Sequence, residues 1–335
     1  MSDREALEAR FNSGSGEIGE FSDPRGFRGG PVFWGPSGLR AGWRILIAVT
    51  IWLALLLGLG LAMARIPWPR AQLRMAALGG EQNPAFLLLT ESMSVAATLL
   101  TMLAMTKIER RSFADYYLPG SDAFGLRFWQ GLACGLAMVS LMMGLIAAFH
   151  GFSLGSVALA AGAATRYGLV YAIAFLLVGL FEESTFRGYL QSTLGSGIGF
   201  WPAALVLAAI FGGSHLSNPG EARYGALMAG CFGLLAALTL ARTGSLWFAI
   251  GMHSAWDWGE SFLYSVPDSG LVVRGRLLNS SFHGPVWLTG GTVGPEASIF
   301  SFVALLVSAI GVHFLFPKTQ IAKAPPDEDT DRRAG

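Results

Sequence analysis

The most regular feature of the chain is a series of long apolar runs separated by short polar segments. A membrane-spanning helix needs about 20 consecutive apolar residues. The run at 45–64, between Arg44 and Arg65, meets that length. Further apolar runs follow it, at 84–106, 128–149, 167–187, 200–218, 224–241, 246–262 and 297–316. The pattern predicts an all-α fold, a polytopic membrane bundle of about eight transmembrane helices.

These runs divide the chain into four predicted regions. Residues 1–40 and 318–335 are polar and lack the apolar content of a core, so we expect each to be a mobile tail. Residues 41–150 would form an N-terminal membrane region of three helices. Residues 151–317 would form a second membrane domain, which contains the polar motifs described below.

The amino-acid composition also indicates that most of the chain lies in a lipid bilayer. Hydrophobic residues make up 53% of the chain and charged residues only 13%, whereas soluble domains average about 25% charged. The net charge is +1, and many arginines flank apolar runs, which speaks to membrane orientation and not to a nucleic-acid partner, so we expect none. Both cysteines lie within apolar runs, so neither a disulfide framework nor a cysteine-based zinc cluster is indicated.

The distribution of basic residues predicts the orientation. With eight spans the two tails lie on the same side, and most of the 23 lysines and arginines fall on that side. The positive-inside rule then places both tails in the cytoplasm, with the chain in the plasma (inner) membrane. The segment 263–296 would be extracytoplasmic. Its Pro, Gly and Ser content favours an irregular cap over another span.

Several ionisable side chains lie within the predicted spans. Each costs about 2.5–3.5 kcal/mol at mid-depth on insertion scales, so such residues usually face the bundle interior and have a function. They are Glu91, Glu182, Glu183, Arg187, His215, His253 and Asp257. At a rise of 1.5 Å per residue, Glu182, His215 and Asp257 lie about 18, 22 and 18 Å along their helices from the cytoplasmic end. We therefore expect three helices to bring polar groups to one depth.

Helical spacing assigns partners in the first part of this group. Glu183 and Arg187 are four residues apart, so they share a helix face and can neutralise each other. An always-charged guanidinium cannot act as a base, which favours a structural role for Arg187. Glu182 points about 100° away and is expected to be unpaired. A carboxylate of this kind suits a general base or acid that holds one water together with His215.

The remaining polar residues have two interpretations each. His253 and Asp257 are four apart on one face, and a His253 donor could stabilise an anionic oxygen. Alternatively, His253 forms an interhelical hydrogen bond and Asp257 only selects its tautomer. Glu91 either supports the site or is a packed, protonated carboxyl group.

Three sequence elements resemble the signature motifs of a known family. EESTFR at 182–187, FGGSH at 211–215 and HSAWD at 253–257 are similar to the motifs EExxxR, FxxxH and HxxxN or HxxxD of the CPBP family. That family joins type II CAAX prenyl endopeptidases with bacteriocin-processing and self-immunity proteins, the abortive-infection family. The resemblance covers about 165–262. In addition, GPVWLTGGTVGPEAS at 284–298 resembles a loop common in bacterial members.

The resemblance implies an intramembrane endopeptidase whose catalytic domain is the region 151–317. Glu182 and His215 would activate the attacking water, while His253 and Asp257 would stabilise the oxyanion of the tetrahedral intermediate. Asp257 stands where prenyl endopeptidases often have Asn. Because an ionised Asp cannot donate to an oxyanion, Asp257 is either protonated or only orients His253. The resemblance gives Glu183 and Arg187 a supporting role; the supporting role considered for Glu91 comes from its depth and not from the resemblance.

Cofactor and substrate stay open at this point. If a metal is present, zinc would be bound by Glu182, His215 and His253 with one position open. The sequence lacks HExxH, however, and the same residue types serve a metal-free water mechanism. The substrate would be a peptide or lipidated protein within the bilayer: a prenylated C-terminus, a leader peptide or a membrane segment. The alternative is a non-catalytic immunity or interaction protein, or a small-solute transporter.

Overall fold

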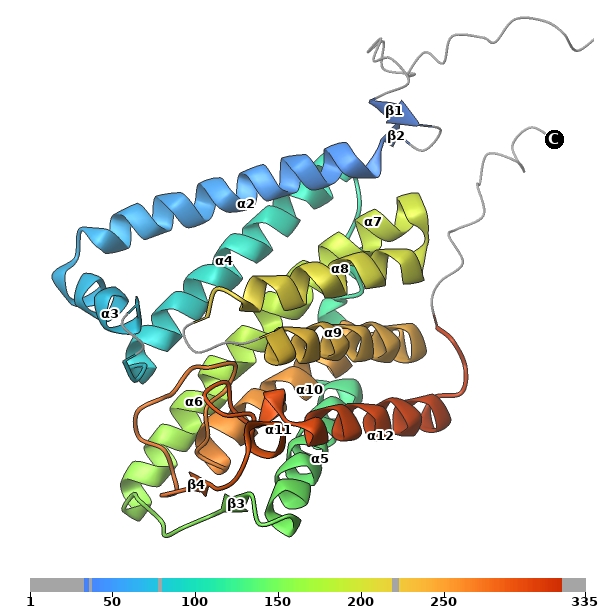
Figure 1. Cartoon of the computed structure of the whole chain (residues 1–335). Coiled ribbons are helices and arrows are strands. Elements are labelled where there is room, and N and C mark those ends of the chain that lie inside the picture. The colour runs from blue at the N-terminus through green and yellow to red at the C-terminus, as the bar shows by residue number, and fades with distance from the viewer. Residues whose placement is uncertain (1–32, 36–37, 78–79, 219–222, 321–335) are drawn as a thin grey trace, which may run out of the picture.

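The computed structural model describes residues 33–35, 38–77, 80–218 and 223–320 (Figure 1). Almost all of the predicted N-terminal tail and most of the C-terminal tail lie outside these residues. The first half contains β1 (Trp34–Gly35), β2 (Gly38–Leu39), α2 (Ala41–Ala64), α3 (Pro67–Ala77), α4 (Pro84–Glu109), the 3-10 helices η1 (Phe113–Tyr116) and η2 (Gly120–Asp122), α5 (Leu126–Ala148) and β3 (Phe152–Ser153).

The second half contains the three helices that carry the sequence motifs. Its elements are α6 (Ala161–Glu183), the π-helix η3 (Ser184–Leu190), α7 (Gln191–Ile198), α8 (Phe200–His215), α9 (Arg223–Thr243), α10 (Leu246–Trp258), the π-helix η4 (Gly259–Leu263), β4 (Ser281–Phe282), α11 (Val286–Thr289), the 3-10 helix η5 (Pro295–Ala297) and α12 (Ile299–Leu315).

Each predicted apolar run forms a helix, which confirms the all-α membrane fold. Five segments are long and apolar enough to cross a membrane: α2, α4, α5, the continuous segment Ala161–Ile198 and α9. Two more apolar helices, α8 and α12, are shorter. The complete set of eight spans is therefore still a prediction. One further helix, α3, follows the first span in a segment where no apolar run predicts it.

Local chemistry sets the start and end of α4. Pro84 occupies the first helical turn, where its missing N–H leaves no intrahelical bond unmade. The side chain of Asn83 accepts a hydrogen bond from the Ala85 amide at 2.9 Å and so caps the helix. The helix ends at Glu109, and the next residue, Arg110, caps it in a left-handed conformation with φ of 55°.

Helix α10 lies at the centre of the bundle. All twelve residues from Leu246 to Asp257 are buried. Its closest neighbour is α5, which approaches through glycines. A Cβ on Gly131 would lie 2.0 Å from the Phe248 carbonyl oxygen, and one on Gly135 would lie 2.1 Å from that of Met252. Hydrogen at these two positions is what allows the backbones to pack this closely.

The segment 264–298, called the cap loop below, covers one end of the bundle. Strand β4 of this loop pairs with β3, with Phe282 opposite Phe152. A backbone bridge joins Gln82, just before α4, to Val273. The longest described helix in the loop is α11, with four residues, which agrees with the predicted irregular cap. The cap loop and α3 lie at the end of the bundle opposite β1 and the C-terminal end of α12 (Figure 1).

Candidate functional site

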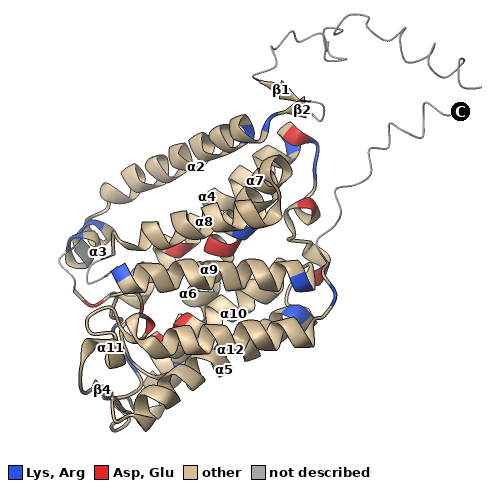
Figure 2. Ribbon diagram, turned by 45° about the vertical axis from the view of Figure 1, so that its right-hand side comes forward, with Lys and Arg blue, Asp and Glu red and all other residues tan. Residues whose placement is uncertain are grey.

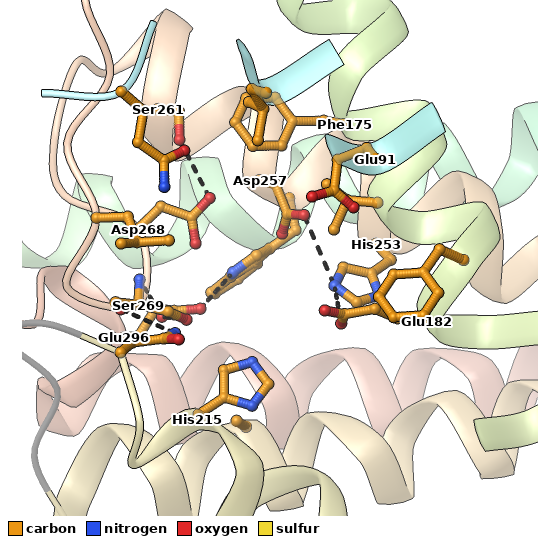
Figure 3. Close-up of a pocket in the computed structure, with 18 of the residues that line it drawn as sticks. Glu91, Phe175, Glu182, His215, His253, Asp257, Ser261, Asp268, Ser269 and Glu296 are labelled. Carbon is orange, nitrogen blue, oxygen red and sulfur yellow. Dashed lines mark hydrogen bonds and ion pairs between the residues drawn. The ribbon is translucent and has the colours of Figure 1, made fainter. Parts of the chain in front are cut away.

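One pocket collects the ionisable residues that the sequence placed at a common depth. It is lined by Glu91 of α4, Glu182 of α6, His215 of α8, and His253 and Asp257 of α10. Figure 3 shows these side chains converging from four helices, and Figure 2 shows acidic residues inside the bundle with a basic segment beside them. The convergence expected from helix geometry is present.

Behind the pocket, Glu183 contacts two basic side chains. Its Oε1 lies 3.2 Å from Nη1 of Arg187 and 2.8 Å from Nδ1 of His253. Glu183 is 0% exposed and Arg187 2%. The Arg187 guanidinium also lies over the Phe211 ring, 4.3 Å from its centroid. The predicted Glu183–Arg187 pair is confirmed, and it forms where α6 changes to the π-helix η3, a widened turn of the kind found at functional sites.

The second nitrogen of His253 faces the pocket. Nε2 lies 3.6 Å from Oε2 of Glu182 and 3.7 Å from Oδ2 of Asp257. Glu182 therefore has an ionisable neighbour, His253, and is not the unpaired carboxylate that the helical wheel predicts. The wheel describes only one helix, whereas this neighbour comes from α10. The Glu182 side chain remains 21% exposed, so it is accessible from the pocket.

His215 is oriented by its own helix. Its Nδ1 lies 2.8 Å from the carbonyl oxygen of Phe211, one turn earlier. A carbonyl oxygen can only accept, so Nδ1 carries the proton and Nε2 of the neutral ring is left as an acceptor. The ring also packs edge-on against Phe211, with centroids 4.7 Å apart. His215 thus presents a defined basic nitrogen at the pocket.

The cap loop contributes polar lining that the sequence interpretation missed. Glu296 accepts hydrogen bonds from the Trp256 indole at 3.1 Å and from the backbone and hydroxyl of Ser269 at 2.8 and 2.6 Å. Asp268 accepts one from Ser261 at 3.1 Å. Burial, together with the negative charges of Asp257 and Glu296, raises the pKa of Asp268 well above its usual range. Acidic loop residues resemble solvated ones in a sequence, so only the Glu of the 284–298 element gave a signal.

The rest of the pocket wall is mainly apolar. Aromatic and aliphatic side chains from α4, α6 and α9 surround the carboxylates. They are Phe86, Leu87, Phe175, Val178, Phe181, Met228, Ala229 and Phe232. The site therefore combines a few convergent polar groups with an apolar surface, which is the usual composition of a ligand pocket.

The zinc ligands considered from the sequence do not gather as a metal site. Zinc ligands lie about 2.0–2.2 Å from the ion, so their own atoms must lie close together. Among the described residues, only Glu260, Asp268 and Glu296 form a group of potential ligands within 4.8 Å of one another. The set Glu182, His215 and His253 is not such a group.

Comparison with known proteins identifies the region that contains the motifs. Comparison with the curated proteins and with the solved structures gave no significant match. A family model, type II CAAX prenyl endopeptidase Rce1-like, matches residues 165–259. The matched region runs from α6 to the start of η4 and holds four of the pocket's ionisable residues: Glu182, His215, His253 and Asp257. Residues 165–259 are therefore a domain of the type II CAAX prenyl endopeptidase family, whose members are membrane peptidases.

Proposed function

We propose that the protein is an intramembrane endopeptidase that hydrolyses a peptide bond with a water activated by Glu182 and His215. The observation that carries this proposal is the pocket in which Glu182, His215, His253 and Asp257 converge from α6, α8 and α10. Residues that are far apart in sequence and costly to bury have been collected at one accessible cavity. A purely structural role does not require that they share a cavity.

The acceptors available in the pocket support water activation. The Glu182 carboxylate and the free Nε2 of His215 can both accept hydrogen bonds, so together they can hold one water. A proton passes from this water to Glu182 while the water oxygen attacks the carbonyl carbon of the substrate. The same proton then moves to the departing amine as the C–N bond breaks. Glu182 thus acts first as base and then as acid.

His253 is positioned to stabilise the negative oxygen that forms. Its Nδ1 is held by Glu183, so the ring orientation is set before the substrate binds. In the doubly protonated form, Nε2–H donates toward the pocket, where the oxyanion develops. Asp257, 3.7 Å from Nε2, orients this ring. Glu183 and Arg187 are positioning residues, because they act through His253, and Glu91 supports the same pocket wall.

The location of the pocket bears on substrate access. Its lining extends to Gln82, Asp268 and Leu271, at the cap-loop end of the bundle. We propose that the substrate enters from this end. With eight spans and both tails in the cytoplasm, as we propose from the basic residues, this end faces away from the cytoplasm. The cap-loop location favours a leader peptide or membrane segment over the prenylated cytoplasmic tail that also fits the family.

Mass spectrometry of membrane fractions tests the proposed activity. Cells that express wild type should contain a cleavage product that is missing with Glu182→Gln, because the amide cannot take up the water proton. Glu81→Gln is the matched control, since Glu81 is 47% exposed and does not line the pocket. Immunoblotting and a thermal melt establish that all three proteins are abundant and folded. Identical peptide profiles would instead favour a non-catalytic immunity or interaction protein, or a transporter.

Substitution of Asp257 tests whether this residue orients the His253 ring or is needed for its negative charge. If Asp257 only orients His253, Asp257→Asn should retain cleavage within about tenfold of wild type, because the amide keeps the size and can still contact the ring. Asp257→Ala should lower the rate by about 100-fold, because a His253 ring that is no longer oriented stabilises the oxyanion poorly. The measurement is the cleavage rate of the peptide found above. Equal losses in both variants would show that the ionised carboxylate itself is required.

A further inference from the structure

A second cluster of carboxylates lies at the cap-loop end of the pocket, outside the proposed catalytic group. Glu260 comes from η4, Asp268 from the cap loop and Glu296 from η5. One oxygen of each lies within 4.8 Å of those of the other two. Figure 3 shows Asp268 and Glu296 beside Ser269, on the side of the pocket away from Glu182. Three acidic groups at this separation repel one another unless something neutralises them.

Glu260 is the member of this cluster that lacks any partner. Its side chain is 0% exposed, and neither carboxylate oxygen receives a hydrogen bond. In the described part of the chain, no lysine or arginine forms an ion pair with Glu260, Asp268 or Glu296. A buried carboxylate with neither hydrogen bonds nor a counter-charge is among the most costly groups in a protein interior. A cation bound beside Glu260 would offset this cost.

The donor set defines the chemistry of that ligand. All three residues offer oxygen and none offers nitrogen or sulfur, which suits a hard cation such as Ca²⁺ or Mg²⁺. Oxygens on opposite sides of a Ca²⁺ ion lie about 4.6–5.2 Å apart, twice the 2.3–2.6 Å bond length, whereas Mg²⁺ needs about 4.0–4.2 Å. Separations within 4.8 Å lie inside the range that oxygens bound to one Ca²⁺ ion can have. Ca²⁺ also tolerates an irregular arrangement of carboxylates, whereas Mg²⁺ demands near-ideal octahedral geometry.

Each of the three carboxylates has an oxygen lone pair that can bind a cation. Neither oxygen of Glu260 accepts a hydrogen bond, and the Asp268 carboxylate accepts the one from Ser261 on Oδ2. Glu296 accepts the Trp256 indole on Oε1 and Ser269 on Oε2, and these bonds hold its carboxylate in a fixed orientation. Such fixed ligands, with water from the pocket, can complete the six to eight oxygens that Ca²⁺ takes.

We propose that Glu260, Asp268 and Glu296 bind one Ca²⁺ ion between the cap loop and the end of the helix that carries His253 and Asp257. The ion links η4, which precedes the cap loop, with Asp268 inside the loop and with η5 near its end. It thereby fixes the cap loop over the pocket. This site is separate from peptide hydrolysis and does not depend on the proposed function.

Terbium luminescence tests the site on the purified full chain in detergent. Tb³⁺ substitutes for Ca²⁺ and is sensitised by a nearby indole, here Trp256, whose Nε1 contacts Glu296. Excitation of tryptophan should give Tb³⁺ emission with wild type, and Ca²⁺ should compete it away while equal Mg²⁺ should not. Glu260→Gln should weaken Ca²⁺ competition and Tb³⁺ binding at least about tenfold, because the number of charged ligands sets affinity. Glu81→Gln should bind as wild type does.

Thermal unfolding gives a second readout that needs no emission. Ca²⁺ should raise the melting temperature of wild type and of Glu81→Gln relative to EGTA, and should not raise that of Glu260→Gln. In EGTA, Glu260→Gln should melt at or above wild type, because the amide removes a buried charge without changing volume. If that variant does not fold, Asp268→Asn replaces it. Wild type that binds no Tb³⁺ and melts identically in Ca²⁺ and EGTA would overturn the proposal in favour of protons shared among the carboxyl groups.

Discussion

Replacement of Arg187 by methionine is expected to destabilise the protein by about 3–5 kcal/mol, the usual result of removing one partner of a buried ion pair. Arg187 is the only lysine or arginine within 4 Å of Glu183 among the described residues, and both side chains are almost fully buried. Without it, the Glu183 carboxylate would depend on His253 alone. Methionine retains the apolar stem, so the loss reflects the charge and not a large cavity.

The free energy of unfolding in mixed micelles measures this effect. Arg166→Met is the matched control, because Arg166 lies exposed on α6 and should change stability by less than about 0.5 kcal/mol. The double variant Glu183→Gln and Arg187→Met should recover most of the loss, since it leaves no uncompensated charge. If Arg187→Met unfolds like wild type, the pair is not ionic and Glu183 carries a proton in the folded protein.

Gly135→Ala is expected to destabilise the bundle by at least about 3 kcal/mol, at the upper end of overpacking effects. The added Cβ would lie 2.1 Å from the Met252 carbonyl oxygen and 3.0 Å from the Ala255 Cβ. The first of these contacts is with backbone, which cannot rotate away as a side chain can. Helix α10 would have to move as a whole, and with it His253 and Asp257.

Gly144→Ala on the same helix supplies the control. A Cβ at Gly144 meets nothing within 4 Å, so alanine there should be neutral or stabilise by up to about 1 kcal/mol through its higher helix propensity. Thermal melts of the two variants in detergent make the comparison. Equal melting temperatures would show that α5 and α10 do not approach at Gly135 as closely as the structure indicates.

The helix packing and the buried ion pair together explain how the pocket is organised. Gly233 on α9 leaves room for Arg187, since a Cβ there would lie 2.2 Å from its Nη2. Arg187 holds Glu183, and Glu183 holds His253. Side chains from η3, α6 and α10 are thus locked before substrate binds, which is the preorganisation that electrostatic catalysis requires. Loss of any one of these contacts should displace His253.

Hydropathy and helical spacing by themselves determined the helices and one of the pairs. Apolar runs of spanning length must form helices in lipid, because backbone groups have no water to bond to. The four-residue spacing of Glu183 and Arg187 was enough to predict their contact, since neighbours on a helix face are a local property. The helical rise per residue also predicted that Glu182, His215 and Asp257 lie at a common depth.

Only the tertiary structure decided what approaches these residues from other segments. The bond between His253 and Glu183 joins positions 70 residues apart, and no periodicity encodes it. Likewise, Asp268 and Glu296 lie in a loop whose course depends on pairing with β3 and with Gln82. Loops have no repeating hydropathy pattern from which their position can be derived. Sequence therefore specified which helices carry the chemistry, while long-range packing decided which groups surround it.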